Sequence, residues 1–332
     1  MTDRPLRWGI ASTGGIAASM TQALQTLDGP TGAEVVAVGS RSPDSAEEFA
    51  ARFDIPHAHG SYADLYADPD VEIVYVASPH SHHHEMTIDA LRAGKHVLCE
   101  KAFALNAAQS REMAAVAREH DRFLMEAMWT WFMPAVIDLK RRIEAGEIGD
   151  IVVIEADFGL TVLDEDGRHR RPDLAGGALL DLGIYPIAFA RYFAGDPVGT
   201  FTGVKALGKL GPSGVDATLG GVVSFESGAF GVFYTTLDAT TTLGATIIGT
   251  DGQITVDPPF WFPSSYTIRV NGQQPENVVI PNQGLAHEAA HAMERIRGGF
   301  LESDVIPLDV TISTMEILDE IRKQVGVVYP GE

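Results

Sequence analysis

The chain has 332 residues, of which 45% are hydrophobic and 21% are charged. This is an ordinary globular composition, and its length favours two domains over one. The formal net charge of −21 disfavours nucleic acids and anionic membranes as partners, because an acidic chain is repelled by both.

Nothing at the start of the sequence has the pattern of a secretory signal. The residues from Met1 to Arg7 carry charges and are not followed by an apolar run. We also find no stretch of about twenty apolar residues that would span a membrane. The single cysteine, Cys99, cannot form an internal disulfide, so folding needs no oxidising compartment. We therefore expect a cytoplasmic protein.

The first part of the chain alternates short apolar runs with segments of helical periodicity. Ser42 and Pro43 are a typical N-cap and first residue of a helix, and Asn106 with Gln109 resembles a capping box. Short apolar runs that alternate with helices, and that are apolar on both faces, indicate a parallel sheet covered by helices on both sides. We predict a doubly wound α/β domain over residues 1–127. Its expected strands are 6–11, 34–38, 72–77, 96–99 and 122–126.

The pattern changes after about residue 150, where apolar runs follow one another across glycine-rich turns. Consecutive strands with short turns favour an antiparallel or mixed sheet. We predict a second domain of the α+β class over residues 128–332, with an open and mostly antiparallel sheet. Its expected strands are 150–160, 200–207, 218–226, 229–237, 245–249 and 253–256, and its expected helices are 176–194, 285–296 and 309–325.

A turn of small residues follows the first expected strand. Ser12, Gly14 and Ala17 occupy the three positions of a dinucleotide-binding fingerprint, with serine in place of the first glycine. The free N–H groups of the following helix would hold a pyrophosphate. We therefore predict cofactor contacts at Ser12, Thr13, Gly14, Gly15 and Ile16. The alternative is an ordinary turn between a strand and a helix.

The second expected strand ends in Ser40-Arg41-Ser42. An NAD site usually has a carboxylate near this point, and a carboxylate would repel a 2′-phosphate, whereas Arg41 and the serines would attract one. The sequence thus favours NADP over NAD, with Ser40 and Arg41 as contacts. The alternative is that Arg41 is a solvated surface residue.

Four histidines, at positions 80, 82, 83 and 84, follow the third expected strand. A metal site is disfavoured, because adjacent side chains point in different directions and no cysteine or carboxylate cluster stands at ligand spacing. We expect instead a strand-end loop facing the nicotinamide, with contacts from Ser78, His80 and His83. No metal site is therefore predicted.

The next strand ends in Glu100-Lys101, which places both residues at the carboxyl edge of the sheet beside the cofactor. Trp129 comes near the domain junction and is also expected to contact the cofactor. In the second domain, Asp181 and Tyr185 are four residues apart, so a helix places them on one face.

These segments resemble the glucose–fructose oxidoreductase, inositol dehydrogenase and rhizopine-catabolism (GFO/IDH/MocA) family over nearly the whole chain. The most specific segments are Glu-Ala-Met-Trp-Thr at 126–130, Cys-Glu-Lys at 99–101 and Gly-Gly-Ala-Leu-Leu-Asp-Leu-Gly-Ile-Tyr at 176–185. Within the family, the chain is most similar to the dimeric dihydrodiol dehydrogenase and NADP-dependent D-xylose 1-dehydrogenase branch.

The resemblance implies roles for particular residues. Lys101 matches the family's catalytic lysine, Tyr185 the tyrosine of this branch, and Asp181 the acidic residue one helical turn before it. His83 matches the histidine of the family's strand-end motif. The resemblance also implies a sugar, polyol or diol substrate and a homodimer or homotetramer built through the C-terminal sheet.

The sequence departs from the family pattern at two places. Ala102 replaces the usual proline after Lys101, and Trp131 stands where the branch usually has arginine. A basic loop at 168–171 is either an anion-binding element or a solvated loop. Trp129, Trp131 and Phe132 are either an apolar wall for a sugar or ordinary interdomain core.

The expected reaction is hydride transfer between NADP and the substrate, with Tyr185 exchanging a proton, Lys101 favouring its phenolate and Asp181 orienting the pair. Two alternatives remain open: a regulator that binds the dinucleotide without catalysis, and an enzyme that uses the dinucleotide transiently.

Overall fold

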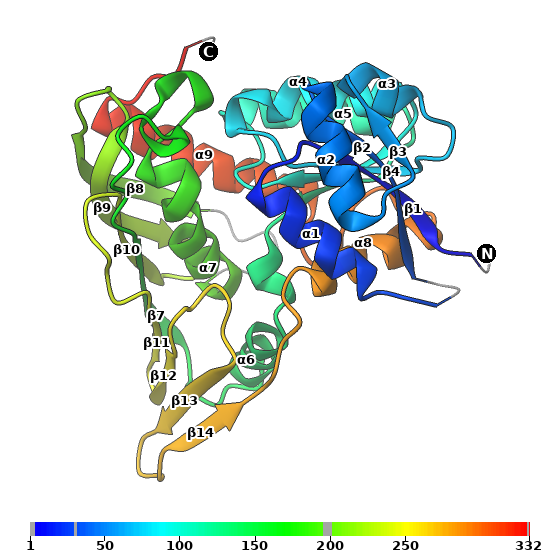
Figure 1. The fold of residues 1–332 in the computed structure, drawn as a ribbon. Coiled ribbons are helices and arrows are strands. Elements are labelled where there is room, and N and C mark those ends of the chain that lie inside the picture. Colours follow the sequence, from blue (N-terminus) through cyan, green and yellow to red (C-terminus); the bar gives the residue numbers. More distant parts are fainter. Residues whose placement is uncertain (1–3, 30–31, 195–200, 331) are drawn as a thin grey trace. The chain divides into compact units, whose positions relative to one another are not determined.

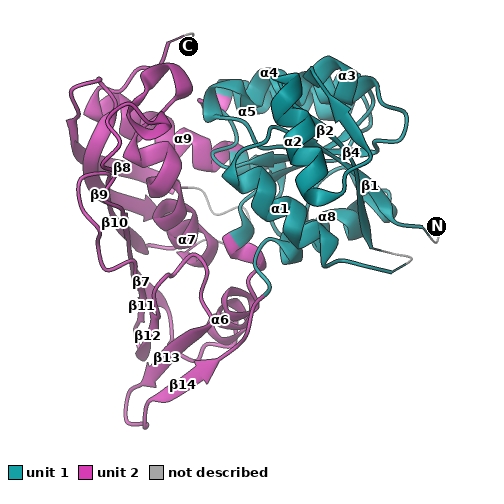
Figure 2. Ribbon diagram, in the orientation of Figure 1, with its two compact units in different colours: residues 1–104, 108–129, 283–311 teal, residues 105–107, 130–282, 312–332 magenta. Residues whose placement is uncertain are grey.

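The computed structural model describes residues 4–29, 32–194, 201–330 and 332, which form two compact units (Figure 2). Unit 1 contains residues 1–104, 108–129 and 283–311, and unit 2 contains 105–107, 130–282 and 312–332. The chain enters unit 2 for three residues at 105–107 and passes to it again at residue 130. The prediction that 128–332 forms one domain is wrong for 283–311, which return to unit 1, where α8 (Ala286–Arg297) packs against α1 (Gly15–Gln25).

Unit 1, which contains β1 to β4 as labelled in Figure 1, is built on a six-stranded parallel sheet. Its strands pair in the order β3-β2-β1-β4-β5-β6. This is the strand order of the dinucleotide-binding fold, and it confirms the predicted doubly wound sheet. The strands are β1 Leu6–Ala11, β2 Ala33–Gly39, β3 His57–His59, β4 Ile73–Val76, β5 His96–Glu100 and β6 Leu124–Ala127. The remaining helices of the Rossmann portion are α2 Pro43–Phe53, α3 Tyr62–Ala67, α4 His83–Arg92 and α5 Ala107–Glu119.

Local signals explain where these elements begin. Ser42 caps α2 by accepting a hydrogen bond from the Ser45 N–H, with Pro43 at the first helical position, as predicted. The sequence analysis missed β3 and α3, because a three-residue strand and a six-residue helix are too short to show a period. The core strands are buried on both faces, so that Ile10, Tyr75 and Leu98 have no exposed surface.

Unit 2 is built on an eight-stranded mixed sheet in the order β14-β13-β12-β11-β7-β10-β9-β8. Among the described strands of this sheet, only the β7–β10 pair is parallel, which confirms the predicted open and mostly antiparallel sheet. The strands are β7 Ile151–Gly159, β8 Phe201–Leu210, β9 Asp216–Phe225, β10 Phe230–Thr236, β11 Ala245–Gly249, β12 Gly252–Val256, β13 Ser265–Val270 and β14 Glu276–Val279. The predicted strand start at Thr200 lies outside the described residues. The helix α6 (Pro134–Glu144) and the strands β13 and β14 were not predicted.

The helix α7 (Ile184–Ala194) packs against β7 and β10 on one face of this sheet. It is preceded by a π-helical turn over Leu179–Gly183, and the last helix, α9 (Leu308–Val325), runs from unit 1 into unit 2. The segment Pro172–Ala194 is long and apolar enough to cross a membrane, but 89% of its apolar window is buried inside the protein. That burial is typical of a core helix in a folded domain.

Three buried glutamates, Glu100, Glu126 and Glu288, lie within unit 1. Glu126 on β6 accepts a hydrogen bond from the Thr311 hydroxyl at 3.0 Å, while its second carboxyl oxygen has no partner among the described residues. Glu288 on α8 is fully buried, and neither of its carboxyl oxygens is hydrogen-bonded within the part of the chain that is described. Burial, with a contribution from Glu100, raises the pKa of Glu126 to about 7, and burial also raises the pKa of Glu288 well above its usual value.

The raised pKa of Glu126 makes stability depend on pH. Between about pH 4.5 and 7 the folded protein keeps a proton that the unfolded chain releases, so the contribution of Glu126 to stability falls as pH rises through this range. We expect Glu126→Gln to gain stability relative to the wild type by up to about 3 kcal/mol across it. Urea unfolding at pH 4.5 and pH 7.5 measures this difference. Glu119→Gln, at an exposed position on α5, is the control, and an unchanged difference for Glu126→Gln at the two pH values would contradict the assignment.

Candidate active site

The predicted cofactor residues of unit 1 follow the carboxyl ends of its parallel strands. Ser12 follows β1, Arg41 follows β2, Ser78 follows β4, Lys101 follows β5 and Trp129 follows β6. Because the strands are parallel, all of these positions lie along one edge of the sheet. The positions expected from the sequence are therefore confirmed, whereas their roles stay predictions.

The turn after β1 leaves the start of α1 open. Ser12 has a φ of 115°, a conformation that favours glycine, and its N–H donates to the Gly39 carbonyl at 3.0 Å. Gly14 is the N-cap of α1; no described side chain caps this helix, and its first turn carries no acidic residue. A Cβ atom built on Gly15 would meet no atom within 4 Å. This turn therefore suits a phosphate group, which needs free N–H groups and close access to the backbone.

A cavity of about 600 Å³ lies beside this turn within unit 1. It joins three predicted residues, Ser12, Arg41 and Ser78, to the side chains of Tyr62 and Tyr66 on α3, which the sequence analysis missed. The other lining residues are Ala63, Ala67, Pro79, His82, Glu85, Met86, Asp89 and Ala93. Its size and its largely apolar walls fit the adenosine half of a dinucleotide.

Arg41 provides the guanidinium of this cavity. Burial raises the pKa of the Tyr62 phenol, and the charge of Arg41 and its hydrogen bond to Tyr62 oppose that rise. Arg41 itself is exposed, while Ser40 is buried and its hydroxyl accepts the Ser42 N–H at 3.2 Å. The exposed guanidinium thus lies next to Tyr62 at the strand end, where a 2′-phosphate would need it, whereas Ser40 holds the turn.

The histidines after β4 diverge, as the sequence analysis expected of adjacent residues. His83 is fully buried, with Nδ1 2.8 Å from the Ala102 carbonyl oxygen and Nε2 2.8 Å from the Ser78 carbonyl oxygen. Burial lowers the pKa of His83 to about 4. His80 is buried with its ring 5.5 Å from that of His83, and His84 pairs with Glu112 on the surface. His83 therefore joins two strand-end loops, and any role toward a cofactor would act through Ser78 and Ala102.

The loop that carries Lys101 is fixed by its neighbours. The carboxylate of Glu100 accepts hydrogen bonds from the Tyr75 hydroxyl and from the Lys101 N–H. The peptide bond between Lys101 and Ala102 is cis, and Ala102 is buried. Together with His83, these contacts hold the backbone on both sides of Lys101, even though Ala102 replaces the family's proline.

In unit 2, two glycines set the start of the helix that carries Asp181 and Tyr185. Gly177 has a φ of 124°, and a Cβ atom there would lie 2.2 Å from a carboxyl oxygen of Asp216. A Cβ atom at Gly176 would lie 2.5 Å from the Arg168 carbonyl oxygen. The other oxygen of Asp216 accepts the Leu179 N–H at 2.6 Å, so that a buried carboxylate caps the helix. Neither glycine can be replaced without moving the backbone.

Asp181 is buried and paired with the basic loop. Arg168 donates to its carboxylate at 3.2 Å, and His169 Nε2 lies 3.0 Å from Asp181 Oδ2. The other arginines of the loop also face carboxylates, Arg170 with Asp238 and Arg171 with Asp173. The loop is therefore largely neutralised by its neighbours, which weakens the interpretation that it binds an anionic substrate and ties it to Asp181 instead.

Tyr185 lies among aromatic rings. It is buried, and its ring centroid is 5.5 Å from that of Phe158 and 6.1 Å from that of Trp261. Phe158 and Trp261 stack with centroids 3.6 Å apart. Neither was predicted, because aromatic residues on separate strands and loops give no local pattern. Trp131 is buried against Tyr192 and belongs to the core of unit 2, whereas the sequence analysis placed such a core between the domains.

Two family models match the chain. The model described as "Oxidoreductase family, NAD-binding Rossmann fold" matches residues 6–128, and the GFO/IDH/MocA C-terminal domain matches residues 136–255. The two matches correspond to the parallel sheet and to most of the mixed sheet, respectively.

Similar proteins support the same assignment. The trans-1,2-dihydrobenzene-1,2-diol dehydrogenases of Bos taurus and Homo sapiens are each 37% identical, over 98% of this chain and 99% of theirs. A crystal structure of KijD10, a 3-ketoreductase from Actinomadura kijaniata, in complex with NADP and TDP-benzene, has a TM-score of 0.87 at 26% identity and covers 97% of this chain and 98% of its own. The agreement of both sheets, both family models and these full-length relatives shows that the chain belongs to the GFO/IDH/MocA oxidoreductase family.

Proposed function

We propose that this protein is an NADP-dependent dehydrogenase that acts on a CH–OH group of a vicinal diol, polyol or sugar. One observation carries the proposal: the same chain holds a cavity at its strand ends in one unit and, in the other, the buried Asp181 and Tyr185, of which Tyr185 lies beside stacked aromatic rings. The printed activity of the dihydrodiol dehydrogenases and the NADP in the KijD10 structure favour this substrate class and this cofactor.

The cofactor is assigned to the carboxyl edge of unit 1. The N-terminus of α1 would hold the pyrophosphate through N–H groups that no described side chain caps. Arg41 would form charge-assisted hydrogen bonds with the 2′-phosphate, and Tyr62 and Tyr66 would contact the adenosine. When bound, NADP supplies the nicotinamide that accepts or donates the hydride.

The proton step is assigned to Tyr185. When the substrate is oxidised, its hydroxyl proton passes to the phenolate oxygen of Tyr185 as the C–H hydrogen leaves with its electron pair; reduction reverses both transfers. A cation beside Tyr185 would favour its phenolate form, which is the role that the family resemblance implies for Lys101. Asp181, held by Arg168 and His169, orients the substrate or the tyrosine. Phe158 and Trp261 offer an apolar surface for the ring of a diol or sugar.

Two further proposals concern the protein in the cell. The first is a cytoplasmic location, because the single cysteine is buried and forms no disulfide, so folding does not need an oxidising compartment. The face of the mixed sheet opposite α7 exposes Phe230, Tyr234 and Val222, as expected if a second copy of the chain covers it in a homo-oligomer.

The direct test of the function is nicotinamide absorbance with the purified protein. We expect NADP reduction with at least one member of a panel of aldoses, inositols and vicinal diols that includes trans-1,2-dihydrobenzene-1,2-diol. Tight NADP binding without reduction across the panel would contradict the dehydrogenase assignment and favour a binding regulator or a transient use of the cofactor.

Replacing Tyr185 with Phe removes the proposed proton carrier and keeps the aromatic ring. We expect turnover to fall by about 10²–10⁴-fold, with the affinity for NADP retained. The matched control is Tyr192→Phe on the same helix, because Tyr192 packs on Trp131 and is assigned no chemistry. Initial rates and NADP titrations measure both quantities, and full turnover in Tyr185→Phe would refute the assignment.

Replacing Arg41 with Ala tests the cofactor preference. We expect NADP binding to weaken by about 10- to 100-fold, the loss of one or two charge-assisted hydrogen bonds, while NAD binding changes little. Titration calorimetry with each dinucleotide measures the two affinities, and Arg52→Ala in α2 is the control. Equal weakening for NAD and NADP would show that Arg41 does not read the 2′-phosphate.

The homo-oligomer is tested on the open face of the sheet. Phe230 and Tyr234 are both exposed on β10, and because they are four residues apart on a strand, their side chains lie on the same face of the sheet. We expect the double substitution Phe230→Asp and Tyr234→Asp to convert the wild-type oligomer to monomer, because charge at an apolar interface is costly. Light scattering on a sizing column measures the mass, with Phe300→Asp on unit 1 as the control. A monomeric wild type would exclude the interface.

A further inference from the structure

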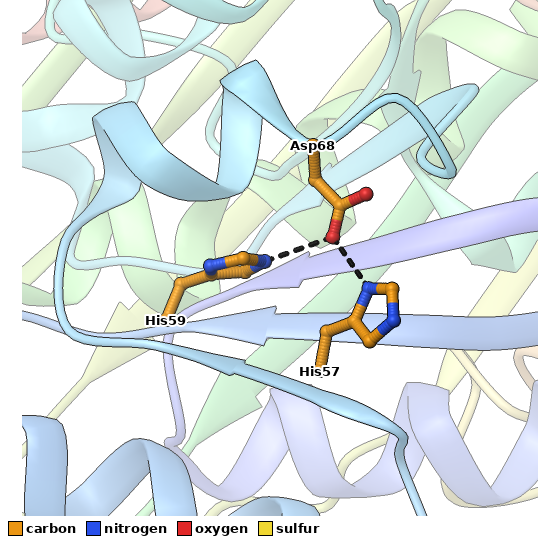
Figure 3. A group of neighbouring side chains, drawn as sticks. All are labelled: His57, His59 and Asp68. Carbon is orange, nitrogen blue, oxygen red and sulfur yellow. Dashed lines mark hydrogen bonds and ion pairs between the residues drawn. The ribbon is translucent and has the colours of Figure 1, made fainter.

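Two histidines and an aspartate converge on one point of unit 1, apart from the residues assigned to the reaction (Figure 3). His57 and His59 are two residues apart on β3, so the alternation of a strand places their side chains on the same side. Asp68 is the C-cap of α3 and directly follows its last residue. His57 Nδ1 lies 2.7 Å and His59 Nε2 lies 2.9 Å from the same oxygen, Asp68 Oδ2.

The carboxylate at the centre of this cluster is buried and held in place. The Asp68 side chain is 4% exposed, and its other oxygen, Oδ1, accepts the Asp70 N–H at 2.8 Å. The Lys95 ammonium donates to the main-chain carbonyls of Asp68 and Val71, at 2.7 Å each, and so fixes the backbone that carries the carboxylate. Such outer contacts are what orient a ligand in a metal site.

The histidines provide access from the solvent. Their side chains are 39% exposed for His57 and 23% exposed for His59. An ion that enters from this side would meet two imidazole nitrogens and one carboxylate oxygen, with room for water in a fourth position. This donor set, two histidines and one carboxylate, suits Zn²⁺ and related divalent transition ions better than Mg²⁺ or Ca²⁺.

The distances require only a small rearrangement. In a tetrahedral zinc site with metal–ligand bonds of about 2.0–2.2 Å, neighbouring ligand atoms lie about 3.3 Å apart. The two nitrogen–oxygen separations here are 2.7 and 2.9 Å, so opening each by less than about 1 Å makes room for the ion. The ion would take the place of the ring hydrogens that face Asp68 Oδ2, and each neutral imidazole would then carry its single proton on its other nitrogen.

We propose that His57, His59 and Asp68 form a binding site for a divalent transition metal ion of the Zn²⁺ class. The site joins the edge strand β3 to the end of α3, since His59 precedes this helix and Asp68 follows it. It is separate in sequence from the histidines at 80–84, which diverge. The acidic chain as a whole also favours cations over anions.

The position of α3 gives the site a consequence for the nucleotide. Tyr62, Ala63, Tyr66 and Ala67, all on α3, line the cavity assigned to adenosine. An ion that ties the C-terminal end of α3 to β3 would restrict this wall of the cavity and lower the cost of ordering it around the nucleotide. This second step rests on the proposed function, whereas the metal site itself does not.

Metal binding is tested on the full chain after treatment with a chelator and without cofactor. We expect titration calorimetry with Zn²⁺ to give one saturable site per chain, and Co²⁺ to give the visible absorption of a four-coordinate ion. His57→Gln and His59→Gln should each weaken Zn²⁺ binding by at least about tenfold, as loss of a ligand must exceed loss of an outer contact. His84→Gln, which removes a surface histidine paired with Glu112, should bind like the wild type.

The outcomes separate the possibilities. No saturable Zn²⁺ site in the wild type, or undiminished binding in both ligand variants, would overturn the proposal. His57 is the more exposed of the two histidines, so His57→Gln is the variant least affected by packing, and its melting temperature without metal checks its fold.

The link to the nucleotide is tested by NADP titration with and without Zn²⁺. We expect several-fold tighter NADP binding with Zn²⁺ in the wild type and in His84→Gln, and no change in His57→Gln. Zn²⁺ binding with unaltered NADP affinity would overturn the link and leave the site in place. Failure to bind NADP under either condition would instead contradict the cofactor assignment, while the calorimetric result for Zn²⁺ would still decide the metal site.

Discussion

Parallel strands end at one edge of their sheet, and the site in unit 1 depends on this constraint. Five segments that are far apart in the sequence deliver Ser12, Arg41, Ser78, Lys101 and Trp129 to that edge. Pairing of the strands alone places these residues at one edge, because the carboxyl ends of parallel strands lie together. The helix N-terminus after Ser12 then adds backbone donors at the same edge.

Buried polar groups hold the loops at this edge in place. His83 contacts the carbonyls of Ser78 and Ala102 and so couples the loops after β4 and β5, while Glu100 accepts from Tyr75 and from the Lys101 backbone. These groups are removed from water, so breaking one of their contacts leaves a desolvated partner, at a cost of about 1–3 kcal/mol. The loops that carry the predicted cofactor contacts are therefore more rigid than their lack of regular structure suggests.

Long elements with a clear period were predictable from the sequence, and so was much of the site. The five longer strands of unit 1 appear where their apolar runs placed them, and helices α2 and α5 begin where the capping signals placed them, because burial of a regular element leaves a regular pattern. Short elements were not predictable. The strand β3 and helix α3 have no period to detect, and with them the sequence analysis missed Tyr62 and Tyr66 in the cavity and the His57–His59–Asp68 cluster. The His-x-His spacing was visible, but without β3 nothing indicated that both rings share a face.

In unit 2, steric restriction of the backbone positions the helix that carries Asp181 and Tyr185. This explains why the glycine motif before that helix could be recognised in the sequence, while the contacts that require it could not. Gly176 and Gly177 are required because backbone and carboxylate atoms occupy the space of a side chain, and the sequence records this requirement as a pair of glycines before a helix. The partners that impose this requirement, the Arg168 carbonyl and Asp216, lie 8 and 39 residues away. A motif thus marks where space is restricted, and only the fold reveals what restricts it. By the same logic, the sequence left the loop at 168–171 as either an anion-binding element or a solvated loop, whereas each of its arginines faces a carboxylate in the folded chain.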